Sequence, residues 1–146
     1  MSTPKTELYA RRLSALIQAE TVSVPEQTDR TKFYEFHRLL QQMFPHLFAV
    51  VEYEDFHGSF LLRWKGRQQK EPILLMNHHD VVEANGEWEH DPFSGHIDET
   101  GRVWGRGTVD TKASLFCIFT ALEELIADGV TPSCDVYIAS SCTEEW

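Results

Sequence analysis

The chain has 146 residues, of which 42% are hydrophobic and 25% charged, a balance that excludes disordered and fibrous proteins and is typical of one globular domain. Its net charge is −10: residues 1–50 hold six basic and five acidic residues, whereas residues 51–146 hold seven and eighteen. The acidic second part argues against nucleic acid or an anionic membrane as partner and favours a protein that gathers cations, although a solvated acidic surface would explain most of these charges equally well.

The cysteines and the N-terminal segment indicate the cellular compartment of the protein. Cys117, Cys134 and Cys142 are an odd number without CxxC spacing, which favours reduced, buried thiols over a disulfide framework. The N-terminal residues lack the apolar segment of a signal peptide, and no run approaches the roughly 18 apolar residues of a membrane span. We therefore expect a cytoplasmic protein.

The first half of the chain predicts two helices followed by strands. Apolar side chains recur at helical spacing over residues 4–20 and 31–43. Strand candidates follow at 48–53, 59–64 and 72–77. Further along, the stretch HIDETGRVWG alternates around a Glu-Thr-Gly turn, as a short hairpin does.

The second half predicts one long helix and one strand. The helix covers residues 111–128, with Cys117 on its apolar stripe and Gly129 as a cap after its last turn. The mostly apolar residues 134–141 resemble a strand that is covered on both faces. Strand, helix and strand in this order predict a βαβ unit, and therefore an α/β fold.

The predicted strand in the stretch LLMNHHDVV ends in polar residues. Side chains two apart share one face of a strand, so His78 and Asp80 should point together while His79 points away. A histidine beside a carboxylate is a common metal arrangement, in which one ring nitrogen binds the ion and the carboxylate orients the ring. Taken alone, this pattern is more often a pair of satisfied polar residues. The other histidines of the chain are expected at the surface or at helix caps: His37, His46, His57, His90 and His96.

Two acidic segments follow later in the chain. Asp110, in WGRGTVDTK, comes after two glycines that allow a tight turn, and the simplest alternative is that it caps the next helix. Glu144 and Glu145, in SSCTEEW, follow the last strand. Adjacent carboxylates disfavour each other's ionisation unless a cation compensates them, although such pairs are also common in solvated loops. Both could reach one site only if the chain turns there.

These residues together predict a metal centre at the carboxyl edge of the sheet, where ligands bind in open α/β folds. Nitrogen and oxygen ligands without thiolate indicate zinc, with manganese or cobalt as alternatives. A bridging carboxylate and a spare glutamate would make a two-metal hydrolytic site, in which the spare carboxylate takes a proton from water.

Four motifs resemble the co-catalytic zinc peptidase family that includes aminoacylase, carboxypeptidase G, carboxypeptidase S and the related dipeptidases. They are LLMNHHDVV, WEHDPFSG, WGRGTVDTK and CTEEW, in the family's order, with 32 residues from His78 to Asp110 and 35 from Asp110 to Glu145. The resemblance covers about residues 70–146, and the first 70 residues match only in layout. It departs at Glu83, where proline is usual, and at Trp146, where a small or aliphatic residue is usual.

The resemblance implies a role for each candidate residue. His78 would bind one zinc ion, Asp110 would bridge two, and Glu145 would bind the other. Asp80 would orient His78, and Glu144 would be the general base. The implied fold is the N-terminal part of a three-layer zinc exopeptidase catalytic domain with a mostly parallel sheet.

The resemblance also implies that residues 1–146 are a fragment. A further acidic ligand, a final histidine and a lid or dimerisation domain, which could support a homodimer, would lie beyond Trp146. The full-length protein would hydrolyse an amide bond in a peptide or an N-acyl amino acid, as an exopeptidase, dipeptidase or aminoacylase does. Residues 1–146 alone would be an inactive half-site. A noncatalytic scaffold or binding relative is the alternative.

Overall fold

Four strands form one sheet in the order β1-β2-β4-β3 in the computed structural model, which describes residues 3–68 and 70–146. The strands are β1 (Glu52–Phe56), β2 (Ser59–Trp64), β3 (Ile73–His78) and β4 (Val136–Ser141). β1 pairs with β2 and β2 with β4 in antiparallel fashion, whereas β3 and β4 are parallel. The predicted α/β class is confirmed. In the described residues the sheet is mixed, not mostly parallel, because a tight turn joins β1 to β2 and forces them antiparallel.

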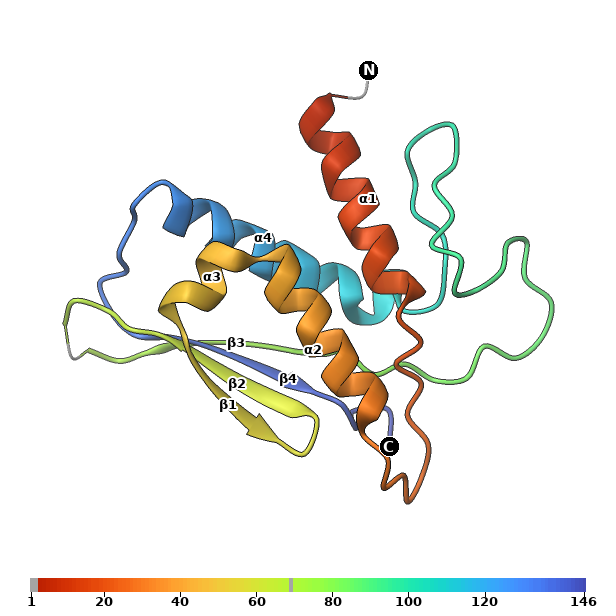
Figure 1. Ribbon diagram of the computed structural model, residues 1–146, viewed down its shortest axis with the longest axis horizontal. Helices are drawn as coiled ribbons and strands as arrows, with labels where there is room; N and C mark the ends of the chain where they lie inside the picture. The colour runs from red at the N-terminus through yellow and green to blue at the C-terminus, as the bar shows by residue number, and fades with distance from the viewer. Residues whose placement is uncertain (1–2, 69) are drawn as a thin grey trace.

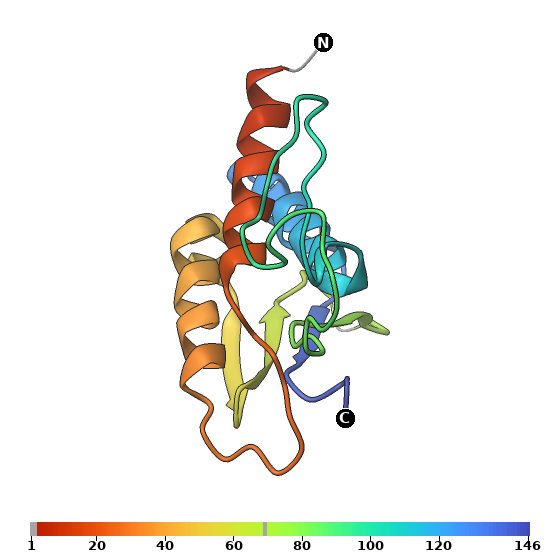
Figure 2. The ribbon, with the colours of Figure 1, turned by 90° about the vertical axis from the view of Figure 1, so that its right-hand side faces the viewer.

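The four α-helices of the described residues lie over the same face of this sheet (Figures 1 and 2). The predicted helices correspond to α1 (Pro4–Gln18), α2 (Thr31–Met43) and α4 (Ala113–Ala127). A short helix that was not predicted, α3 (Pro45–Val50), occupies the first half of the strand expected at 48–53, and β1 begins only at Glu52. Proline has the backbone angle of a first helical residue, so Pro45 starts a helix where an apolar run suggested a strand.

The core lies between the sheet and the helices. Alternate side chains of β2 and β4 are buried, among them Phe60, Leu62 and Ile138, and they pack against the apolar faces of α2 and α4. Cys117 is exposed on α4, so its predicted place in the core is wrong. The buried face of that helix is centred on Leu115, Phe116 and Phe119, and Cys117 lies on the side turned away from it.

The other face of the sheet is open in the described residues. Leu74 and Met76 on β3 are 54% and 71% exposed. Burial alternates along β4, which was expected to be covered on both faces. The described residues therefore form two of the three layers that the resemblance implied. No helix within residues 3–68 and 70–146 has the length and apolarity of a membrane span.

The parallel pair determines where the candidate site lies. β3 and β4 are linked through α4 in the predicted βαβ order, and their register pairs His78 with Ser141. Their carboxyl ends therefore lie side by side. The segment after β3, the loop before α4 and the turn after β4 all begin or end at this edge of the sheet.

Candidate metal centre

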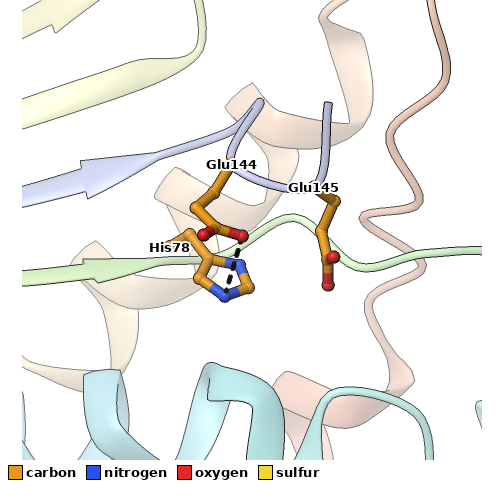
Figure 3. A group of neighbouring side chains, drawn as sticks. All are labelled: His78, Glu144 and Glu145. Atoms are coloured by element: carbon orange, nitrogen blue, oxygen red, sulfur yellow. Dashed lines mark ion pairs between the residues drawn. The ribbon is translucent and has the colours of Figure 1, made fainter.

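Three predicted site residues converge at the carboxyl ends of β3 and β4. Ligand atoms of His78, Glu144 and Glu145 all lie within 4.8 Å of one another (Figure 3). His78 is the last residue of β3 and is 7% exposed, and the two glutamates follow β4. The chain turns at residues 144–145, as predicted, so both adjacent side chains point toward the side of His78.

Asp110 reaches the same place from the loop before α4. Its Oδ1 lies 3.0 Å from His78 Nε2, and its side chain is 76% exposed. The alternative that Asp110 caps α4 is wrong, because that helix begins at Ala113 without a side-chain cap. Gly107 holds the loop close to the segment after β3: its φ is +82°, and a Cβ there would lie 2.7 Å from Val81 Cγ1.

Asp80 contacts both the His78 ring and the turn that carries Glu144 and Glu145. It has no exposed surface. Its Oδ1 accepts a hydrogen bond from the backbone N–H of Glu144 (3.2 Å), and its Oδ2 accepts from the N–H of Glu145 (3.1 Å) and from Ser23 Oγ (2.7 Å). Asp80 therefore also fixes the turn that carries both glutamates, a role that the sequence did not predict.

The orientation of the His78 ring leaves one nitrogen for a cation. Nδ1 lies 3.1 Å from the backbone oxygen of Asp80 and 3.4 Å from its Oδ1. A carbonyl oxygen can only accept, so Nδ1 carries the hydrogen of that bond. Nε2 then faces the carboxylate oxygens of Asp110 and, at 3.6 Å, Glu144. Lone pairs that face one another require a proton or a cation between them, and this donor set fits zinc.

The electrostatics of the cluster also favour a cation. Burial raises the pKa of the Glu145 carboxyl above its ordinary value; the nearby His78 opposes the increase, while the charges of Asp110, Asp80 and Glu144 add to it. A divalent ion would offset this repulsion between carboxylates.

His79 points to the opposite, helix-covered face, as predicted, and is fully buried. Its Nε2 donates to the backbone oxygen of Gly58 (3.0 Å), its Nδ1 lies 2.8 Å from Ser140 Oγ, and its ring stacks on Phe36 and Phe60. Burial lowers the pKa of the His79 imidazole well below its ordinary value. His79 is thus a packed neutral residue of the core, and protein groups satisfy its polar atoms.

His37 was predicted at the surface or at a cap, and this prediction is wrong. It is 4% exposed, with Nε2 3.4 Å from His79 Nε2 and Nδ1 3.0 Å from the Tyr53 hydroxyl. Burial lowers the pKa of His37 to about 4. Its position on α2, one turn after Phe33 and one before Leu40 in the apolar stripe, was the sequence signal that could have identified it.

We expect the stability of the protein to fall as the pH drops through the window between about 6.5 and about 4, partly because of His37. Below pH 6.5 the unfolded chain binds a proton at this residue that the folded protein does not bind until about pH 4. His37→Gln should therefore lose less unfolding free energy than the wild type between pH 7.5 and pH 4.5, by about 2 kcal/mol.

Urea titrations at the two pH values measure this difference. His96→Gln is the control, because it makes the same replacement at an exposed histidine. Equal pH dependence in His37→Gln and the wild type would contradict the account.

Comparison with known proteins identifies relatives of this chain. Residues 74–146 match the model of peptidase family M20/M25/M40. Carboxypeptidase S of Saccharomyces cerevisiae is 36% identical over 144 residues, which cover 93% of this chain and 25% of that protein. An N-fatty-acyl-amino acid synthase/hydrolase of Danio rerio is 37% identical over 153 residues, which cover 99% of this chain and 29% of that protein.

A solved structure supports the fold. Human carnosine dipeptidase 1 aligns with 96% of this chain at a TM-score of 0.76 and 18% sequence identity, and the match covers 32% of that chain. At this identity the likeness concerns the fold alone. The chain spans between a quarter and a third of the length of these three proteins.

Proposed function

The chain belongs to peptidase family M20/M25/M40, and from this premise we propose that the full-length protein is a metal-dependent hydrolase. Its substrate would be an amide bond in a peptide or an N-acyl amino acid. The convergence of His78, Glu144 and Glu145 carries the proposal, because it joins a nitrogen ligand and two carboxylates at one point. The names of two relatives, a carboxypeptidase and an N-fatty-acyl-amino acid hydrolase, support these two substrate classes.

We propose that His78, Asp110 and Glu145 hold zinc, with Asp110 between two ions and manganese or cobalt as alternatives. The short distance from Asp110 to His78 and the raised pKa of Glu145 support these roles. The ions would supply Lewis-acid chemistry, since they polarise an amide carbonyl and lower the pKa of water.

Glu144 would be the general base. Its carboxylate lies near His78 but is 58% exposed, so it is open to both water and a substrate. Glu144 would accept a proton as the water oxygen bonds to the carbonyl carbon, and it would return that proton to the nitrogen as the C–N bond breaks. Asp80 would hold the His78 ring so that Nε2 faces the cluster.

The proposal is tested on the purified full-length protein with a panel of dipeptides and N-acyl amino acids. A chelator should abolish hydrolysis, and added zinc, manganese or cobalt should restore it. His78→Ala should lose both bound metal and turnover, because it removes a ligand, whereas the exposed His96→Ala should keep both. Unchanged hydrolysis by metal-free protein would refute the proposal.

Residues 1–146 alone should be an incomplete site. His78, Glu145 and two contacts from Asp110 would give each of two ions two protein contacts, whereas catalytic zinc usually has about three. We propose that residues outside this chain complete the set.

The noncatalytic alternative, the predicted partners and the predicted location rest on different observations. A noncatalytic scaffold has no need of a carboxylate placed as Glu144 is, so that position favours an enzyme. The predicted homodimer rests on the resemblance, and the cytoplasmic location rests on the cysteines and on the character of the N-terminal residues. The predicted absence of nucleic-acid and membrane partners rests on the charge. All three stay predictions.

A further inference from the structure

A short segment near the N-terminus lies against the residues that follow β3. The Val81 N–H donates to Thr21 O and the Ser23 N–H donates to Val81 O, both at 3.0 Å, around a parallel bridge between Val22 and Val81. On its other side, the segment after β3 is bonded to β4 through His79 N and Ser141 O. The chain around Asp80 is therefore held extended between two neighbours.

Ser23 places its hydroxyl on the Asp80 carboxylate. Ser23 is 1% exposed, and its Oγ lies 2.7 Å from Asp80 Oδ2. Since a carboxylate can only accept, the hydroxyl is the donor. The other two hydrogen bonds to this carboxylate come from the N–H groups of Glu144 and Glu145, so Ser23 supplies its only side-chain hydroxyl among the described residues.

We propose that Ser23 is a positioning residue for the metal centre and acts through Asp80. The bridge to Val81 fixes the Ser23 backbone, and the hydroxyl then fixes the rotation of the carboxylate. In that rotation Asp80 Oδ1 faces both His78 Nδ1 and the Glu144 N–H. This inference rests on the proposed function, because it assigns Ser23 to the same site.

Loss of the hydroxyl would leave a buried carboxylate with backbone donors from one turn only. The carboxylate could then rotate, so that His78 Nδ1 would lose the carboxylate oxygen beside it and the turn at residues 144–145 would lose a fixed acceptor. Partners that orient metal ligands are typically worth about 10-fold to 100-fold in metal affinity or activity. Ser23 is one contact further from the ligands, so we expect about tenfold, the lower end.

The experiment compares variants of the full-length protein by zinc dissociation constant and by kcat and KM. Ser23→Ala should weaken zinc binding about tenfold and lower kcat about tenfold. KM should stay within about twofold of the wild-type value, because the buried Ser23 side chain does not contact the substrate. Ser23→Thr keeps the hydroxyl and should restore both. In an Asp80→Ala background, Ser23→Ala should cause no further loss of zinc affinity, since the partner through which it acts is gone.

Ser14→Ala separates positioning from a general loss of stability. Ser14 is also a buried serine of the N-terminal region, and its Oγ donates to Gly95 O at 2.6 Å, a contact with no residue of the site. It should lower the melting temperature about as much as Ser23→Ala does while zinc affinity and kcat stay at wild-type values.

Two results would overturn the proposal: wild-type zinc affinity in Ser23→Ala, or the same loss of affinity in Ser14→Ala. The wild-type measurements keep this test distinct from that of the proposed function. If the wild type binds zinc without hydrolysing amides, the catalytic proposal fails while the affinity ratios still decide the role of Ser23. If the wild type binds no zinc, both proposals fall.

Discussion

Glu144→Gln in the full-length protein is expected to remove most turnover while leaving the metal content nearly unchanged. Glutamine keeps the size of the side chain and one oxygen, but it cannot accept the proton of the attacking water. General-base catalysis contributes about 10²-fold to 10⁴-fold, and kcat should fall by that order. Steady-state kinetics with an amide substrate, together with elemental analysis for zinc, measure the two effects separately.

The neighbouring residue supplies the matched control. Glu145 lies in the same turn and in the same cluster, but its proposed role is that of a ligand. Glu145→Gln should therefore lose zinc as well as turnover. Zinc loss in Glu144→Gln, with zinc kept in Glu145→Gln, would mean that the two roles are exchanged. Full activity in Glu144→Gln would show that Glu144 is not the general base.

Asp80→Ala is expected to weaken zinc binding by about 10-fold to 100-fold, because the carboxylate orients His78. The same change should loosen the turn at residues 144–145, since both backbone N–H groups lose their acceptor there. Titration of the metal-free protein with zinc gives the affinity. Hydrogen exchange of the Glu144 and Glu145 amides reports on the turn, and both should exchange faster than in the wild type.

Asp98→Ala is the control for this variant. The Asp98 carboxylate also organises a turn, by accepting hydrogen bonds from the N–H groups of Thr100 and Arg102 and from Trp104 Nε1, but it contacts no residue of the candidate site. It should disturb only its own hairpin and leave zinc affinity unchanged. Wild-type affinity in Asp80→Ala would show that His78 keeps its orientation without the carboxylate.

Most of the helices and strands could be predicted, because their periodicity is local. The apolar spacing of α1, α2 and α4 and the short apolar runs of β2 and β4 are properties of consecutive residues, and these elements lie where they were expected. The errors occurred where periodicity is ambiguous. The apolar run after Pro45 fits a helix or a strand, and in the mostly apolar helix α4 the apolar character of Cys117 does not show that it lies on the side turned away from the core.

The sequence by itself determined which donor atoms the candidate site contains and after which strand or before which helix each of them comes. Alternation along β3 separates His78 from His79, and the family's motifs single out Asp110, Glu144 and Glu145. These conclusions need no long-range contact, because they depend on residue type, on the strand repeat and on the order of the motifs.

Only the tertiary structure decided how these residues meet and what supports them. The parallel pairing of β3 with β4 and the turn after β4 bring His78 and the two glutamates within 4.8 Å. Ser23 reaches Asp80 from 57 residues away, and His37 pairs with His79 across 42 residues. The packing of the fold determines these partners, because a buried polar atom must form a hydrogen bond with a group that lies beside it in the folded protein. Its neighbours in the sequence do not specify which group that is.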